Sequence, residues 1–191
     1  MRFEDGTSLR LYRQTVQDFG LYPGLELTET ELLKLKEAAG QMSAKMRAVR
    51  IVSASSVSKG DLERRLVQKG EDPDQAKQAV QWLSDMDILD DRKTAEQVVQ
   101  RCISKGYGLS RAKQALYEKR IPKAYWDAAL EDYPDQTDAI VAFLRSRLGT
   151  DWDERELRRA TDALLRRGHS YQEIRHGLRQ LSVDEDFAEE Y

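Results

Sequence analysis

The sequence predicts an all-α protein built from tandem three-helix repeats. Leu66, Leu116 and Leu164 are separated by 50 and then 48 residues, and the residues around them recur with similar spacing. Small or apolar residues follow each leucine at ten, thirteen, fourteen and seventeen positions, which is the spacing of one buried helix face. A unit of this size cannot bury its apolar face alone, so we expect the repeats to stack into an elongated, curved array.

The N-terminal segment, residues 1–57, departs from this pattern. The Asp-Gly pair at 5–6, followed by alternating leucines, indicates a short β-hairpin. After it we expect one helix from Thr28 or Thr30 to about residue 39, and a second over about 43–51 that leads into the first repeat.

The first repeat, residues 58–107, carries start and stop signals for its helices. Serine or aspartate stands at each predicted N-cap, proline follows the second cap, and glycine follows the first and third helices. The starts are Ser58, Asp72-Pro73 and Asp90-Asp91, and the stops are Lys69-Gly70 and Gly106.

The second repeat, residues 108–149, and the third, residues 150–183, follow the same plan. Helices should begin near Ser110, Pro122 and Pro134-Asp135 in the second repeat, and near Asp151 and Ser170 in the third. Ser170 and Glu173 have the spacing of a capping box. The last helix of the third repeat is missing or reduced to an acidic tail, residues 184–191, with five acidic side chains.

Composition indicates a soluble protein of the reducing cytoplasm, and we expect it to be a monomer. The net charge of −3 does not by itself predict a nucleic-acid binder. One cysteine, Cys102, excludes an internal disulfide framework. No apolar run is long enough to cross a bilayer, and the first residues lack a signal-peptide core, so we expect no membrane association.

Residues that usually carry catalysis or bind metal are sparse. The chain has two histidines, His169 and His176, and Cys102 is distant from both in sequence, so a zinc site with about four N or S ligands is not expected. The glycines around Tyr107 lack the flanking strand and third glycine of a nucleotide-binding loop. We therefore expect no catalytic residue, no metal and no cofactor.

The three tryptophans could stack on nucleic-acid bases or fill the core. Trp126 lies on the repeated apolar stripe, so we expect it to be buried with Leu116 and Leu130. Trp82 is one position off that stripe and Trp152 lies near a helix cap, so both interpretations stay open for these two.

Basic residues recur in the first helix of each repeat, and we call them the basic set. Equivalent positions line up along one edge of a stacked array, which predicts a contact with an acidic partner, protein or nucleic acid. Alternatively, bases simply favour helix C-termini, by about 0.3–1 kcal/mol each. Because capping explains Arg64, Arg65, Arg158 and Arg159 poorly, we expect charge reversal there to leave folding intact. The set is Arg64, Arg65, Lys69, Lys113, Lys119, Arg120, Arg158, Arg159, Arg166 and Arg167.

Several segments resemble a known family, the RecX regulators of the bacterial RecA recombinase. Ser58 to Gly70, followed by Leu83, Ile88-Leu89-Asp90-Asp91 and Ala95, resembles its first repeat. The N-terminal region of longer family members resembles Asp5-Gly6, Gly20-Leu21, Pro23-Gly24 and Leu27. The second repeat of the family resembles Gly106-Tyr107-Gly108, Leu116 and Lys119-Arg120-Ile121-Pro122.

Two departures from the family pattern stand out. Arg120 occupies a position where the family usually has glycine, so we expect that helix to end differently. Residues 52–56 are an unusual approach to the first repeat, and the arginine-bearing segment typical of the family is only partly echoed by Arg47 and Arg50.

The resemblance implies a non-enzymatic regulator that acts in recombination, DNA repair and the SOS response. Family members bind the RecA filament on single-stranded DNA, lie along its groove, and block filament growth, ATPase, strand exchange and coprotease activity. The basic set is then the predicted contact surface, with a weak direct DNA contact as a further option. Two alternatives stay open: a helical protein that binds nucleic acid directly, and a generic helical scaffold.

Overall fold

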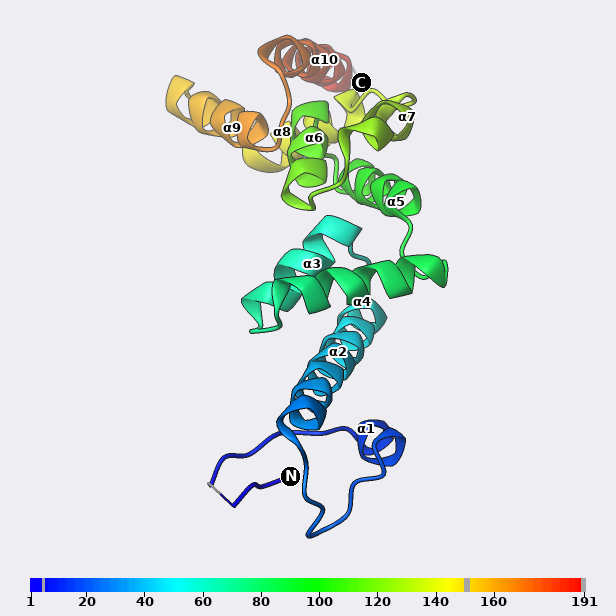
Figure 1. Ribbon diagram of the computed structural model, residues 1–191. Coiled ribbons are helices and arrows are strands. Elements are labelled where there is room, and N and C mark those ends of the chain that lie inside the picture. Colours follow the sequence, from blue (N-terminus) through cyan, green and yellow to red (C-terminus); the bar gives the residue numbers. More distant parts are fainter. Residues whose placement is uncertain (5, 150–151, 190–191) are drawn as a thin grey trace. The chain divides into compact units, whose positions relative to one another are not determined.

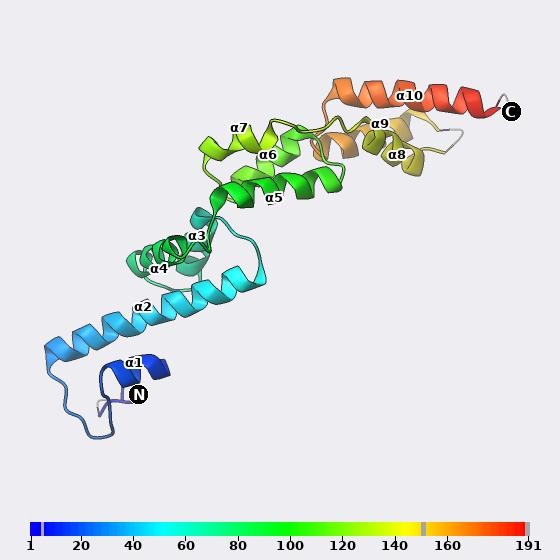
Figure 2. The same cartoon turned by 90° about the vertical axis from the view of Figure 1, so that its right-hand side faces the viewer.

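The computed structural model describes residues 1–4, 6–149 and 152–189, and it is mostly helical (Figures 1 and 2). The chain divides into two compact units, unit 1 (Met1–Asp90) and unit 2 (Asp91–Tyr191). Over the described residues, β-structure is confined to one antiparallel bridge between Arg2 and Ser8. The all-α class is confirmed, and the predicted hairpin is reduced to this single pairing.

Unit 1 places the first predicted repeat helices against one long helix. Its helices are α1 (Arg13–Asp18), α2 (Glu29–Ala54), α3 (Lys59–Gln68) and α4 (Pro73–Asp85). Alanines of α2 pack against leucines of α3 and small residues of α4, and all of these side chains are buried. Short side chains on α2 let the backbones approach closely, so the core is compact although few large residues contribute to it.

The two helices expected before the first repeat are one continuous helix, α2, which corrects the prediction of a break near residue 40. Thr28 begins it with a capping box, in which its side chain accepts from the Glu31 N–H and the Glu31 carboxylate accepts from the Thr28 N–H. Gly40 lies inside α2, where an added Cβ atom would meet only the movable side-chain amide of Gln75 on α4. The helix continues through this glycine.

Unit 2 contains two hydrophobic clusters. Its elements are α5 (Asp91–Ser104), α6 (Leu109–Glu118), the 3₁₀ turn η1 (Lys123–Tyr125), α7 (Trp126–Leu130), α8 (Thr137–Arg147), α9 (Glu154–Arg166) and α10 (Tyr171–Glu189). One cluster joins α5, α6 and α7 around Val99 and Leu116. The other joins α8, α9 and α10 around Leu144, Leu164 and Leu181. Helix α5, which was predicted to close the first repeat, packs against α6 and α7 and falls in unit 2. The repeat boundaries themselves stay a prediction.

Backbone contacts tie the two clusters of unit 2 together at the loops before α6 and α10. The Gly108 N–H donates to the Arg167 carbonyl over 2.9 Å, and a Cβ atom on Gly108 would collide with the backbone of Gly168. Within the cluster around Leu116, the Tyr133 hydroxyl donates to the Tyr107 carbonyl over 2.6 Å. Close backbone approach therefore sets where α6 begins, at a Gly108 N-cap and not at the predicted Ser110.

The helix starts predicted at Ser58, Asp72-Pro73, Asp90-Asp91 and Ser170 are confirmed. A 3₁₀ turn and not an α-helix follows Pro122, and α8 begins at Thr137, two residues after Asp135. Ser58 and Asp72 accept N-terminal N–H groups of α3 and α4, and Ser170 and Glu173 form the predicted capping box. Helix α9 begins at Asp153, which forms a capping box with Glu156. The predicted cap Asp151 lies outside the described residues.

The first helices of the three repeats end in the same way, which corrects the expectation for Arg120. Gly70, Arg120 and Gly168 all follow the C-cap and have positive φ angles of 88°, 52° and 89°. In each case the next residue donates its N–H to the carbonyl of the repeated leucine, Leu66, Leu116 or Leu164. Arg120 therefore adopts the left-handed conformation that glycine reaches without steric cost.

The repeated leucines are fully buried, with exposed fractions of 0%, 0% and 1% for Leu66, Leu116 and Leu164. Trp126 is half-buried and not fully buried as predicted. It packs on the cluster that contains Leu116, and its indole N–H donates to the Ile121 carbonyl over 3.0 Å.

Helix α10 continues to Glu189, so residues 184–189 extend a helix and are not a separate tail as predicted. No helix of the described residues is both long enough and apolar enough to span a membrane.

Candidate functional site

The basic set occupies three different environments. Arg64 and Arg65 are half-buried against a carboxylate, and Lys119 and Arg167 are half-buried at helix ends. The remaining members are exposed: Lys69, Lys113, Arg120, Arg158, Arg159 and Arg166. Positions that are equivalent in the repeat are therefore not equivalent in their surroundings.

In α3, two arginines are bound to a buried acid. Asp61 is 1% exposed, and its carboxylate oxygens lie 2.6 Å from Arg64 Nη2 and 2.8 Å from Arg65 Nη2. Burial opposes ionisation of this carboxyl, but hydrogen bonds and charge from the two guanidinium groups outweigh burial and hold the pKa of Asp61 below its usual range. The expectation that charge reversal at Arg64 and Arg65 leaves folding intact is not supported, because it would leave Asp61 buried beside like charges.

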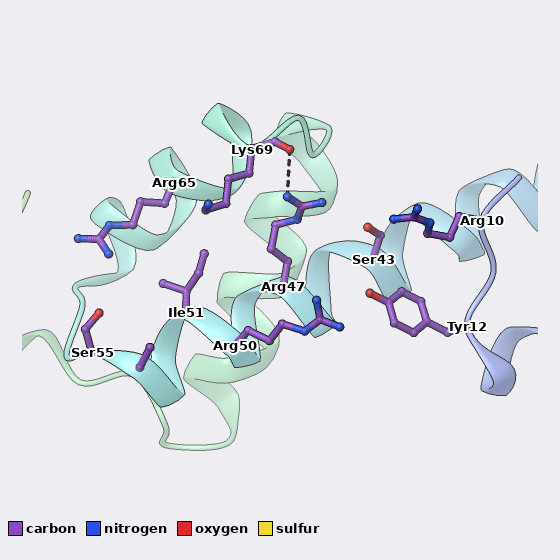
Figure 3. Close-up of a pocket in the computed structure, with 10 residues that line it drawn as sticks. Arg10, Tyr12, Ser43, Arg47, Arg50, Ile51, Ser55, Arg65 and Lys69 are labelled. Carbon is purple, nitrogen blue, oxygen red and sulfur yellow. Dashed lines mark hydrogen bonds between the residues drawn. The ribbon is translucent and has the colours of Figure 1, made fainter.

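Unit 1 contains a pocket of about 490 Å³ rich in basic side chains (Figure 3). Its bases come from the N-terminal segment, from α2 and from the end of α3: Arg10, Arg47, Arg50, Arg65 and Lys69. Tyr12 and Ile51 add apolar surface. Figure 3 shows Arg47 and Arg50 between Arg10 and Tyr12 on one side and Arg65 and Lys69 on the other. Cations from three separate segments therefore meet in one concave surface.

Arg47 is held in this pocket by a buried acid. It pairs with Glu71, which is 8% exposed and also accepts a hydrogen bond from the Ser43 hydroxyl over 3.0 Å. Arg47 Nη1 donates to the Lys69 carbonyl over 3.2 Å, at the end of α3. These contacts fix the guanidinium group between α2 and α3.

Three bases of the pocket have no such partner. Among the described residues, no carboxylate forms a salt bridge with Arg10, Arg50 or Lys69. Arg65 and Lys69 belong to the basic set predicted from the sequence. Arg10, Arg47 and Arg50 do not, although Arg47 and Arg50 echo the arginine-bearing segment typical of the family. The available signal was the three-residue spacing of Arg47 and Arg50, which places both on one side of a helix.

A smaller basic pocket, about 180 Å³, lies in unit 2 between α5 and α6. Its bases are Arg101, Lys105, Arg111 and Lys119. Arg111 pairs with Glu118 over 3.0 Å, so part of this charge is neutralised. Cys102 lines the pocket, and burial raises the pKa of its thiol, which disfavours the reactive thiolate.

Cations near the end of α9 contact aromatic rings. The Arg167 guanidinium lies 4.6 Å from the centre of the Phe143 ring and 6.0 Å from that of Tyr107. Arg147 lies 5.6 Å from the Phe143 ring. Cation–π contacts of this kind stabilise exposed sites by about 0.5–1 kcal/mol, so Arg167 has a structural role besides any partner contact.

The two tryptophans left open by the sequence are partly buried. Trp82 packs on the core of unit 1, with Lys45 Nζ 5.3 Å from its ring centre. Trp152 packs on the cluster around Leu164 in unit 2. Both therefore contribute to the core.

His169 is a buried structural residue. It is 3% exposed, and its Nε2 lies 3.0 Å from the Gly106 carbonyl oxygen. Burial lowers the pKa of His169 below its ordinary value. Within the described residues, no cluster of three or more His, Cys, Asp or Glu side chains is placed to hold a metal ion.

Comparison with known proteins gives one consistent family. A family model described as RecX, second three-helix domain, matches residues 90–130. A protein named Regulatory protein RecX from Xanthomonas campestris pv. campestris is 31% identical over 136 residues, covering 70% of this chain and 84% of that protein. The protein of the same name from Halorhodospira halophila is 28% identical over 153 residues, covering 78% and 94% of the two chains.

Two solved structures have the same fold. A crystal structure of regulatory protein RecX superposes with a TM-score of 0.62 at 21% identity, covering 87% of this chain and 86% of the other. The crystal structure of RecX from Lactobacillus salivarius gives a TM-score of 0.63 at 22% identity, covering 76% and 99%.

Proposed function

The chain belongs to the RecX family, and we propose that it is a non-enzymatic regulator that binds the RecA filament on single-stranded DNA and inhibits recombinase activity. The observation that carries this proposal is the 31% identity, over most of both chains, to a relative named Regulatory protein RecX. The inhibited activities would be filament extension, ATPase, strand exchange and coprotease activity, and the site of action would be the cytoplasm.

The distribution of exposed bases supports an extended contact. Exposed or half-buried cations are found on α3, α6 and α9, and both units contain a basic pocket. A filament presents the same surface many times, so several modest contacts can add up to specific binding. The protein would bind as a monomer and use no catalytic residue or cofactor.

The basic set remains the proposed contact surface, but only some of its members can be replaced without also changing the stability of the fold. Arg158 and Arg159 on α9 are exposed, and no salt bridge joins either to another described residue. Arg64 and Arg65 neutralise Asp61, so a variant there would change folding and binding together. The α9 pair therefore gives the sharper test.

The test is inhibition of the DNA-dependent ATPase of RecA by R158E/R159E. We expect the concentration for half-inhibition to rise about tenfold or more, since loss of attraction at two sites costs at least about 1.4 kcal/mol. The matched control is K36E/K77E, which makes the same charge change at two exposed lysines outside the basic set. If both double variants inhibit as well as the parent protein, the α9 contact is wrong.

Co-sedimentation separates the alternatives. Binding to RecA filaments on single-stranded DNA that is clearly tighter than binding to the same DNA alone supports the proposed function. Equal binding to DNA alone supports a direct nucleic-acid binder, and binding to neither leaves a generic scaffold. Binding should weaken as salt rises, because exposed charges are screened beyond about 8–10 Å at 0.1–0.15 M.

A further inference from the structure

We propose that the basic pocket of unit 1 is a phosphate-binding site, which takes the backbone phosphates of a single-stranded nucleic acid or the phosphates of a free nucleotide. The ligand would bind to this protein in the absence of RecA, so the proposed site is additional to filament binding. It rests on the charge balance of the pocket, on the way two of its arginines are held, and on its apolar surface.

The charge balance of the pocket favours an anionic ligand. Five bases line the pocket, and two carboxylates, Glu71 and Asp61, pair with Arg47 and Arg65. Arg10, Arg50 and Lys69 then face the same concave surface without a salt-bridge partner among the described residues. Like charges collected in a cleft raise the local concentration of anions. A multiply charged ligand fits this excess better than a single carboxylate does.

Two of the arginines are already oriented. Glu71 and the Lys69 carbonyl hold Arg47, and Asp61 holds Arg65. The side chains therefore lose little further conformational freedom when a ligand binds. Guanidinium groups donate paired hydrogen bonds that match the oxygens of a phosphate. Glu71 and Asp61 thus act as positioning residues for two phosphate donors.

The remaining surface of the pocket suits the rest of a nucleotide. Tyr12 and Ile51 line it beside the bases, as Figure 3 shows. An aromatic ring next to a basic groove is the usual arrangement for stacking a nucleic-acid base, and it tolerates any base. A volume of about 490 Å³ lies within the range of small-ligand pockets, about 300–1,000 Å³.

The experiment measures binding to the full chain in the absence of RecA and magnesium. The test variant is R10Q/R50Q, because these arginines lack a carboxylate partner among the described residues and their loss leaves no buried acid uncompensated. The control variant is K36Q/K77Q, which removes two exposed charges from the same unit outside the pocket. Circular dichroism and melting temperature verify that both variants fold.

The probes are a labelled 12-nucleotide oligothymidylate, followed by fluorescence anisotropy, and inorganic pyrophosphate and a hexaglutamate peptide as competitors. We expect R10Q/R50Q to bind the oligonucleotide about tenfold or more weakly, and K36Q/K77Q to stay within about threefold of the parent. The slope of log affinity against log salt should fall by about 1.4 in R10Q/R50Q, at about 0.7 for each lost single-strand phosphate contact.

The competitors identify the source of the phosphate. Oligonucleotide binding that R10Q/R50Q loses and that pyrophosphate displaces only weakly assigns the pocket to a nucleic-acid backbone. Tight pyrophosphate binding that R10Q/R50Q also loses assigns it to a free nucleotide. Equal losses in both double variants, no loss in either, or stronger competition by hexaglutamate than by pyrophosphate would each overturn the proposal. None of these results depends on RecA, so they are independent of the filament experiment.

Discussion

Helices α3 and α9 hold the same place in their repeats but use their arginines differently. Both bury a repeated leucine, Leu66 or Leu164, and both end in a left-handed glycine. Five residues before the leucine, α3 has the buried acid Asp61 and α9 has the exposed base Arg159. The acid draws Arg64 and Arg65 of α3 into salt bridges, whereas Arg158 and Arg159 of α9 face solvent. The two pairs occupy different repeat positions, two and one residues before the leucine in α3 but six and five residues before it in α9. A buried acid therefore gives the α3 pair a structural role that the α9 pair does not have.

Charge reversal at the two arginine pairs should give the largest difference in the free energy of unfolding. R64E/R65E should lower the free energy of unfolding by about 3 kcal/mol or more, because it leaves Asp61 buried without a counter-charge. R158E/R159E should change it by less than about 0.5 kcal/mol per site, as is usual for surface substitutions. Urea denaturation followed by circular dichroism measures both.

The control for this prediction is the triple variant that adds Asp61→Leu to R64E/R65E. Removing the buried charge should restore part of the lost stability, since an apolar side chain suits that position. Equal losses in the α3 and α9 double variants would contradict the structural role assigned to Arg64 and Arg65.

A smaller effect is expected at the helix ends, where Arg120 can be compared with Gly70. R120G should raise the free energy of unfolding by about 0.5–1 kcal/mol. It releases about 1–2 kcal/mol of left-handed strain, offset in part by the greater freedom of glycine in the unfolded chain. G70R should lower stability by a similar amount, because φ at that position is 88°.

Thermal denaturation of these two variants, alone and together, measures the effect. The sites lie in different units and 50 residues apart in the sequence, so their changes should add. Destabilisation by R120G would mean that the Arg120 side chain makes a contact that outweighs its backbone strain.

The smallest effect concerns pH and distinguishes the buried ionisable groups of the two units. His169 has a lowered pKa in the folded protein, so below about pH 6.5 the unfolded chain binds more protons and stability falls as the pH falls. Asp61 also has a lowered pKa, and its contribution is present above its ordinary value of 3.8 and is lost only as the pH falls further. Stability should therefore decline between pH 7 and 5.5 because of unit 2.

Urea denaturation of H169Q and H176Q across this pH range tests the assignment. H169Q should reduce the decline, whereas H176Q, which replaces an exposed histidine, should keep it. The same decline in H169Q as in the parent would assign it to another group.

Local signals predicted local structure well. The serine and aspartate caps of α3, α4 and α10 lie where their sequence patterns indicated, because a cap needs only the residues within one helical turn. The predictions failed where a distant segment decides the outcome. Helix α2 runs through Gly40 and packs against α4, and α6 begins at Gly108 because the backbone of Gly168 lies against it.

By itself, the sequence determined the helical repeat, the buried leucines at its period and the likeness to the RecX family. The tertiary structure alone decided which arginines are free and which neutralise buried acids, and it brought Arg10, Arg47, Arg50, Arg65 and Lys69 into one pocket. The physical reason is that helix periodicity follows from hydrogen bonds between near neighbours, four residues apart. The charge environment of a side chain depends instead on groups that only packing brings within a few ångströms.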